Sequence, residues 1–178
     1  ARLALDRVTV ETGIRLTKGQ QQAAIAILAS RDRTLAIQGD AGAGKSAMLR
    51  PVAALAADAG RPVLGLAVSH AVASRLGQDV GIRTQTVARF LHEQRGLADG
   101  SGQQAMCRPL KGAVLIVDEA SMLSTADARA LVAIANAAGV ARLVLVGDRQ
   151  QLGAVEAGRP FADLQRGQAT PALRQNLR

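Results

Sequence analysis

Hydrophobic and polar positions divide the chain into short apolar runs and longer amphipathic segments. The apolar runs predict strands, because a strand covered on both faces of a parallel sheet carries few polar residues. The amphipathic segments between them predict helices, and this alternation is typical of an α/β domain. The predicted strands are 34–38, 62–68, 113–117 and 142–146. The predicted helices are 17–30, 45–59, 70–78, 84–94, 126–138 and 160–165.

The remaining segments lack periodicity. Residues 96–109 are rich in Gly, Ser, Gln and Asp, which predicts a surface loop. Residues 1–15 are expected to form an N-terminal arm, with a short helix or a short strand as the alternatives. Residues 16–178 show no internal repeat or linker and are expected to form one domain.

Composition narrows the classes of function. The net charge is +8 and the pI is about 11.3, which favours a nucleic-acid partner. The alternative is that arginine is simply abundant, since it is scattered along the chain. Phe90 and Phe161 are the only aromatic residues, so base stacking cannot dominate the chemistry.

The cysteine and histidine content argues against a metal cluster. Cys107 is the single cysteine, and His70 and His92 lie far apart in the sequence. A lone cysteine excludes an internal disulfide, and no apolar run approaches the length of a membrane span. We therefore expect a soluble, cytoplasmic protein.

A glycine-rich motif joins the first strand to the next helix. The segment Gly39-Asp40-Ala41-Gly42-Ala43-Gly44-Lys45-Ser46 matches the pattern GxxxxGK[ST] of a phosphate-binding loop (P-loop). Small residues let backbone N–H groups surround phosphates, and the helix N-terminus adds a favourable dipole. Lys45 is expected to reach the β- and γ-phosphates of ATP, and the Ser46 hydroxyl to bind Mg²⁺.

Two adjacent acidic residues follow the apolar strand 113–117. Because ligands bind at the carboxyl ends of parallel strands, Asp118 and Glu119 should lie beside the P-loop. Asp118 is expected to hold Mg²⁺ through its water shell, and Glu119 to orient and deprotonate the attacking water. The alternative is an ordinary acidic helix cap.

A third polar element, Gly147-Asp148-Arg149-Gln150-Gln151-Leu152, follows the last long strand. Its position predicts that it lies beside the nucleotide. Gln151 is the candidate γ-phosphate sensor, and Arg149 is a second candidate that could equally be an exposed turn residue.

Together these motifs resemble the first RecA-like domain of superfamily 1 DNA helicases, in the branch of the RecD-type helicases and the conjugative relaxases of the TraA/TraI type. The resemblance runs from about residue 16 to residue 178 and implies a three-layer P-loop NTPase fold. It also implies ATP and Mg²⁺ as cofactors, single-stranded DNA as partner and 5′-to-3′ movement.

The resemblance also implies roles for further residues. Gln20 matches the glutamine that contacts adenine, although it also stands at a capping-box position. Ser69, His70, Thr84 and Thr86 match motifs that contact the single strand, although Ser69 and Thr84 could instead cap helices. Arg178 matches an arginine that reaches the γ-phosphate, and Arg174 takes this place if the motif is aligned in another register.

Helicases of this class need a second RecA-like domain, for which 178 residues leave no room. We therefore expect an isolated motor half of a larger protein, with little turnover and no unwinding by itself. One alternative is a vestigial motor domain that only binds single-stranded DNA or a protein. Another is a P-loop ATPase without a nucleic-acid role.

Overall fold

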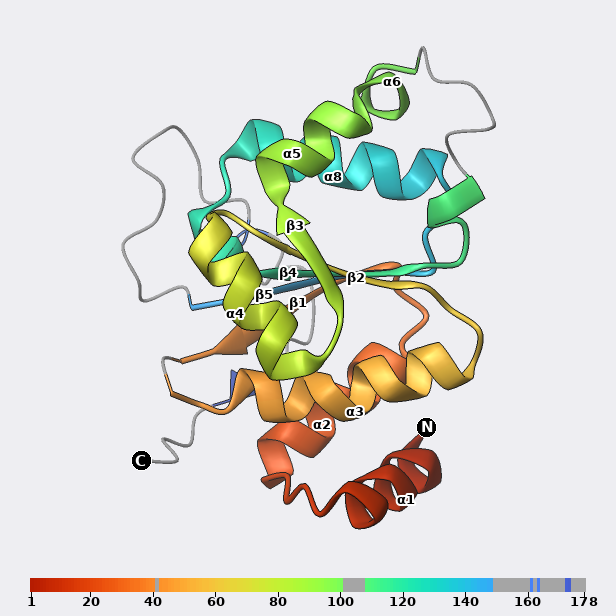
Figure 1. Ribbon diagram of the computed structural model, residues 1–178, viewed down its shortest axis with the longest axis vertical. Coiled ribbons are helices and arrows are strands. Elements are labelled where there is room, and N and C mark those ends of the chain that lie inside the picture. Colours follow the sequence, from red (N-terminus) through yellow and green to blue (C-terminus); the bar gives the residue numbers. More distant parts are fainter. Residues whose placement is uncertain (41, 101–107, 149–160, 162, 164–171, 174–178) are drawn as a thin grey trace.

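A six-stranded sheet forms the centre of the molecule, and every strand pair in the described residues is parallel (Figure 1). The computed structural model describes residues 1–40, 42–100, 108–148, 161, 163 and 172–173. The strand order is β3-β2-β4-β5-β1-β6. The strands are β1 (Thr34–Gly39), β2 (Val63–Ala67), β3 (Arg83–Thr86), β4 (Val114–Asp118), β5 (Arg142–Gly147) and β6 (Ala172–Leu173).

Helices cover both faces of this sheet. The helices whose bounds lie within the described residues are α1 (Arg2–Thr12), α2 (Lys18–Ala29), α3 (Lys45–Asp58), α4 (His70–Val80), α5 (Val87–Glu93), α6 (Arg95–Ala98) and α8 (Thr125–Ala137). Two single turns of 3₁₀-helix, η1 (Arg108–Leu110) and η2 (Ala120–Met122), flank β4.

Two hydrophobic cores separate the three layers. On one face, α2, α3 and α4 pack against the sheet through residues such as Met48 and Leu76. On the other face, α5, α6 and α8 pack through residues such as Phe90 and Leu131. Figure 1 shows the sheet edge-on between these two layers. The predicted three-layer α/β fold with a mainly parallel sheet is confirmed.

The first residues of the chain form a helix. Leu5 and Val8 of α1 are buried, and Leu5 joins the core on the α3 side of the sheet. The helix ends at Gly13, whose φ of 68° is the left-handed conformation that glycine adopts without strain. This helix lies outside α2 and α3 as seen from the sheet (Figure 1).

The helix predicted over residues 84–94 begins later than predicted, so the predicted start was wrong. Residues Arg83–Thr86 form the edge strand β3, which pairs with β2 so that Thr84 lies opposite Gly65. The helix begins at Val87, and its N-cap is Thr86, whose Oγ1 accepts from the backbone N–H of Arg89. Pairing with a neighbouring strand therefore overrides the local capping signal of Thr84.

The predicted loop 96–109 contains more regular structure than expected. Residues Arg95–Ala98 form α6, and Arg108–Leu110 form η1, each held by a buried leucine. Residues 101–107 lie outside the described part of the chain, as does most of the predicted helix 160–165. No helix among the described residues is long and apolar enough to cross a membrane.

Candidate functional site

The P-loop occupies the turn between β1 and α3, at the carboxyl edge of the sheet. Gly42 and Gly44 have φ values of 76° and 70°, so both adopt the left-handed conformation that a Cβ would strain. Gly44 is the N-cap of α3, which places Lys45 and Ser46 in the first turn of that helix. The backbone N–H groups of this turn are the phosphate-binding groups that the motif predicts.

The side chain of Lys45 folds back over the start of the P-loop. Its Nζ donates to the carbonyl oxygen of Gly39 at 3.3 Å. A Cβ at Gly39 would lie 2.8 Å from Cδ of Lys45 and 2.9 Å from its Cγ. A side chain at position 39 would therefore displace the lysine stem from this path.

Gln20 holds the P-loop from the side of α2. Its Oε1 accepts from the backbone N–H of Thr17 at 2.9 Å, which completes a capping box at the start of α2. Its Nε2 donates to the carbonyl oxygens of Ala43 at 2.9 Å and Gly44 at 3.3 Å. The side chain is buried, so its amide connects the helix cap to the P-loop. The capping alternative is thus observed, while adenine contact stays a prediction.

A second glutamine supports the P-loop from within the sheet. Nε2 of Gln38, at the end of β1, donates to Oδ1 of Asp40 at 3.2 Å and to Oδ1 of Asp148 at 2.9 Å. Asp148 follows β5, so this amide joins the P-loop to the third polar element of the sequence. Gln38 and Asp148 are both buried. Gln38 carries no local signal in the sequence, because its contact with Asp148 spans 110 residues.

The acidic pair lies where β4 leaves the sheet. Asp118 is the last residue of β4, and its Oδ1 accepts from the backbone N–H of Glu119 at 2.9 Å. Glu119 has a φ of 52° and is the non-glycine residue with positive φ among the described residues. Such a conformation costs about 1 to 3 kcal/mol and is typical of functional sites.

The neighbouring strand is shaped to fit this turn. A Cβ at Gly147 would lie 2.7 Å from the backbone nitrogen of Ser121, which belongs to η2. The glycine at the end of β5 therefore allows the turn that carries Glu119 to lie directly against the next strand.

A cavity of about 380 Å³ joins these elements. It is lined by the P-loop from Gly42 to Ser46, by Asp118 and Glu119, and by the α4 residues Val72, Arg75, Leu76 and Asp79. The Lys45, Ser46, Asp118 and Glu119 side chains therefore share one opening, as the motifs predict. The contribution of α4 was not predicted.

The oxygen donors of the cavity suit Mg²⁺. The Ser46 hydroxyl and the Asp118 carboxylate are hard ligands of the kind that this ion prefers. Among the described residues, no three His, Cys, Asp or Glu side chains converge closely enough to hold a metal by themselves. The site therefore fits an ion completed by nucleotide phosphates and water, which is how Mg²⁺ commonly binds beside ATP.

The residues predicted to contact DNA lie after β2 and β3. Ser69 is exposed and caps α4, its Oγ accepting from the backbone N–H of Val72 at 3.3 Å. His70 is the exposed first residue of α4, and Thr86 caps α5. These three residues thus lie at helix starts on the carboxyl edge of the sheet, where Ser69 and His70 are exposed and Thr86 is half-buried.

Thr84 occupies a different environment. A Cβ at Gly65 would lie 2.7 Å from its Cγ2, and a Cβ at Gly77 would lie 2.9 Å from its Oγ1. The side chain is therefore packed between β2 and α4, where the two glycines leave room for it. Packing accounts for the position of this threonine, and its contact with DNA stays a prediction.

Several predicted site residues lie outside the described residues. They are Ala41 of the P-loop, the candidate phosphate sensors Arg149 and Gln151, and the arginines Arg174 and Arg178.

Sequence comparison supports the identification made from the motifs. A family model described as an AAA domain matches residues 15–178. The multifunctional conjugation protein TraI of Escherichia coli strain K12 is 36% identical over 162 residues, covering 88% of this chain and 9% of TraI. The ATP-dependent RecD2 DNA helicase of Deinococcus radiodurans is 34% identical over 155 residues, covering 87% of this chain and 21% of that protein.

A conjugal transfer protein TraA of Rhizobium radiobacter is 35% identical over 145 residues, covering 80% of this chain and 12% of TraA. The chain thus spans about a tenth to a fifth of the length of these relatives. The predicted resemblance to the RecD-type and TraA/TraI branch is confirmed.

Solved structures share the fold. The Pif1 helicase from Candida albicans superposes with a TM-score of 0.63 at 23% identity, covering 91% of this chain and 40% of that one. A Bacteroides Pif1 in complex with ADP-AlF4 gives a TM-score of 0.56 at 18% identity, covering 86% of this chain and 36% of that one. From residue 15 onward, the chain therefore belongs to the AAA domain family, with the P-loop NTPase fold found in superfamily 1 helicases.

Proposed function

We propose that this chain is the ATP-binding motor domain of a DNA helicase that couples ATP hydrolysis to movement along single-stranded DNA. The observation that carries the proposal is the single cavity that brings Lys45 and Ser46 of the P-loop together with Asp118 and Glu119. Phosphate binding and water activation need these groups within reach of one nucleotide.

Each residue has a distinct task in this proposal. The ammonium of Lys45 exchanges its contact with Gly39 for the β- and γ-phosphates. The Ser46 hydroxyl, and Asp118 through the water shell of the ion, would hold Mg²⁺, which would supply positive charge to the phosphates. Glu119 accepts a proton from the attacking water. Gln151 and Arg178 are proposed to contact the γ-phosphate, as the family resemblance implies.

The proposed DNA contact lies at the start of α4. Ser69 and His70 are exposed there. In the capping bond the oxygen of Ser69 is the acceptor, so the capping bond does not use its hydroxyl hydrogen. Backbone N–H groups at the N-terminus of a helix favour phosphate. The net charge of +8 adds attraction that does not depend on base sequence.

The relatives supply the remaining part of the proposal. TraI and TraA are named as conjugation proteins and RecD2 as an ATP-dependent DNA helicase. We infer that this domain works with a second RecA-like domain that closes over ATP, and that it hydrolyses ATP slowly alone.

Binding of a fluorescent ATP analogue with Mg²⁺ tests the nucleotide site. Lys45→Ala removes a charge-assisted contact and is expected to weaken binding about tenfold or more. Lys111→Ala is the matched control, since Lys111 is exposed and precedes β4 at the opposite edge of the sheet. Equal binding by the unaltered chain and Lys45→Ala would contradict the proposed site.

A labelled single-stranded oligonucleotide tests the DNA part of the proposal. We expect binding that weakens steeply with salt, since counterions are released from the phosphates. Binding of DNA without any binding of nucleotide would instead favour a vestigial domain. Binding of nucleotide without DNA would favour a P-loop ATPase of another kind.

A further inference from the structure

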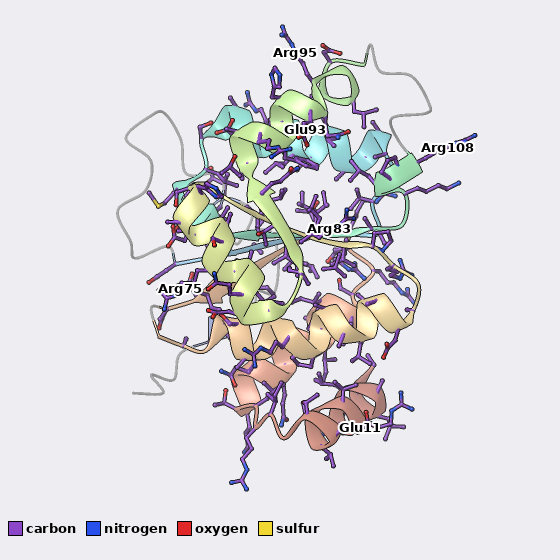
Figure 2. All side chains as sticks on the ribbon, in the orientation of Figure 1. Glu11, Arg75, Arg83, Glu93, Arg95 and Arg108 are labelled. Atoms are coloured by element: carbon purple, nitrogen blue, oxygen red, sulfur yellow. The ribbon has the colours of Figure 1, made fainter. Side chains whose placement is uncertain are left out.

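The nucleotide cavity has a wall that no motif predicts. Helix α4 lines it with Val72, Arg75, Leu76 and Asp79, opposite the P-loop. Figure 2 shows Arg75 on α4, and its side chain is 84% exposed. Asp79 lies one helical turn further along, where α4 approaches the start of α3.

Asp79 is anchored to α3 through both its side chain and its backbone. Oδ2 accepts the hydroxyl hydrogen of Ser46 at 3.2 Å, and the backbone carbonyl oxygen accepts from Nε of Arg50. The same Oδ2 lies 3.8 Å from Nε of Arg75. The carboxylate, 43% exposed, therefore lies directly against the proposed Mg²⁺ ligand.

The direction of this hydrogen bond matters for metal binding. A serine hydroxyl has one hydrogen and two lone pairs. With the hydrogen on Asp79, the lone pairs of Ser46 are available to a cation. With the hydrogen elsewhere, it can point into the cavity and oppose the cation.

Asp79 meets the proposed ligand set through another side chain. Asp79, Asp118 and Glu119 line the same cavity, and the carboxylate of Asp79 accepts the hydrogen bond of the Ser46 hydroxyl. Its contact with the site runs through the Ser46 hydroxyl. Carboxylates that orient a metal ligand in this way commonly change metal affinity by about 10- to 100-fold.

We propose that Asp79 is a positioning residue for Mg²⁺ in the nucleotide site, where it orients the Ser46 hydroxyl and adds negative charge behind it. The inference rests on the proposed nucleotide-binding function. It assigns to α4, the helix whose first residues are the proposed DNA contacts, a second role at the metal.

A different role would be purely structural, with Asp79 joining α3 to α4. The two roles predict different dependence on Mg²⁺. A positioning residue changes nucleotide affinity only when the metal is present. A structural residue changes it to the same extent with and without the metal.

The test compares dissociation constants of a fluorescent ATP analogue in Mg²⁺ and in EDTA. For Asp79→Asn, we expect the gain in affinity due to Mg²⁺ to fall about tenfold. Affinity in EDTA should stay equal or rise slightly, because one negative charge facing the triphosphate is lost. Asp58→Asn, at the exposed end of α3, is the matched control for charge and should leave both constants unchanged.

A double-mutant cycle with Ser46→Ala tests the route through the hydroxyl. Once the Ser46 hydroxyl is removed, Asp79→Asn should reduce the Mg²⁺ effect much less than it does in the unaltered chain, because only the charge of Asp79 is then lost. Additive losses would overturn the proposed route, and so would an unchanged Mg²⁺ effect in Asp79→Asn or parallel weakening in both buffers. Failure of the unaltered chain to bind nucleotide in either buffer would overturn the proposed function itself.

Discussion

Gln38 and Asp148 are joined by a hydrogen bond of 2.9 Å between buried side chains that lie 110 residues apart. The donor stands at the end of the strand that carries the P-loop, and the acceptor follows the next strand of the sheet. The same amide also holds Asp40. One neutral side chain therefore fixes the relative position of two carboxylates beside the proposed phosphate site.

Replacement of Gln38 by leucine should destabilise the fold. The change leaves the buried carboxylate of Asp148 without this donor, and a lost hydrogen bond to a charged group costs about 1.5 to 3 kcal/mol. Urea unfolding measures the change in the free energy of unfolding. Gln22→Leu, on the exposed face of α2, is the control and should change it by less than about 0.5 kcal/mol. Equal stability of both variants would show that the Gln38 contact contributes little.

The two interpretations of Gln20 predict different nucleotide preferences. If its amide mainly holds the P-loop carbonyls of Ala43 and Gly44, Gln20→Ala should weaken ATP and GTP analogues by the same factor. If it contacts adenine, only the preference for ATP should be lost. We expect the first result, because the described contacts already occupy both ends of the amide. Competition binding with the two nucleotides decides between them.

Gln20→Glu separates the cap from the P-loop contact. Glutamate can still accept from the backbone N–H of Thr17, so the capping box can persist. Its carboxylate cannot donate to Ala43 and faces a carbonyl oxygen in a buried place. Nucleotide binding should therefore weaken while the helix content stays the same. Full binding by this variant would show that the P-loop does not depend on the amide.

Packing around Thr84 predicts a rescue. Gly65→Ala introduces a methyl group 2.7 Å from Cγ2 of Thr84 and 2.9 Å from Cδ2 of Leu76, and overpacking of this kind costs about 1 to 3 kcal/mol. Thr84→Ser removes the closer methyl group and should restore part of the lost stability. Thermal unfolding of both single variants and the double variant measures this coupling. Strictly additive effects would contradict the packing described for Thr84.

The pKa of Glu93 lies below its ordinary value of 4.5, chiefly because Nε of Arg89 donates to its carboxylate at 2.7 Å. A lowered carboxyl pKa contributes stability above pH 4.5 that is lost as pH falls through the folded value. Arg89→Gln should raise the Glu93 pKa, and an NMR titration of its carboxyl carbon measures this directly. An unchanged pKa in the variant would exclude Arg89 as the main cause.

Local patterns in the sequence were sufficient to predict the central strands of the fold and the nucleotide motifs. The strands β1, β4 and β5 are buried except at one end residue each, so their apolar composition directly reflects their surroundings. The P-loop and the acidic pair were predictable because each lies where a strand of the parallel sheet ends, and such strand ends lie along one edge of the sheet.

Other features depend on contacts that leave no local pattern. Thr84 carries a capping signal, yet it lies in an edge strand because Gly65 offers a backbone partner. Asp79 meets Ser46 only because α4 packs on α3, 33 residues away. A carboxylate on a surface helix is usually solvated, so the sequence around Asp79 alone would not distinguish this residue from Asp58.

The position of β1 in the sheet has a consequence for how the domain is synthesised. This strand lies between β5 and β6, whose first residues are Arg142 and Ala172. A ribosome therefore completes the ATP-binding strand more than a hundred residues before either of its neighbours exists. Until then, β1 exposes two unpaired edges, which are favourable sites for association with other nascent chains. Folding of the nucleotide site must await nearly the whole domain, so chaperone protection during translation should matter most for this strand.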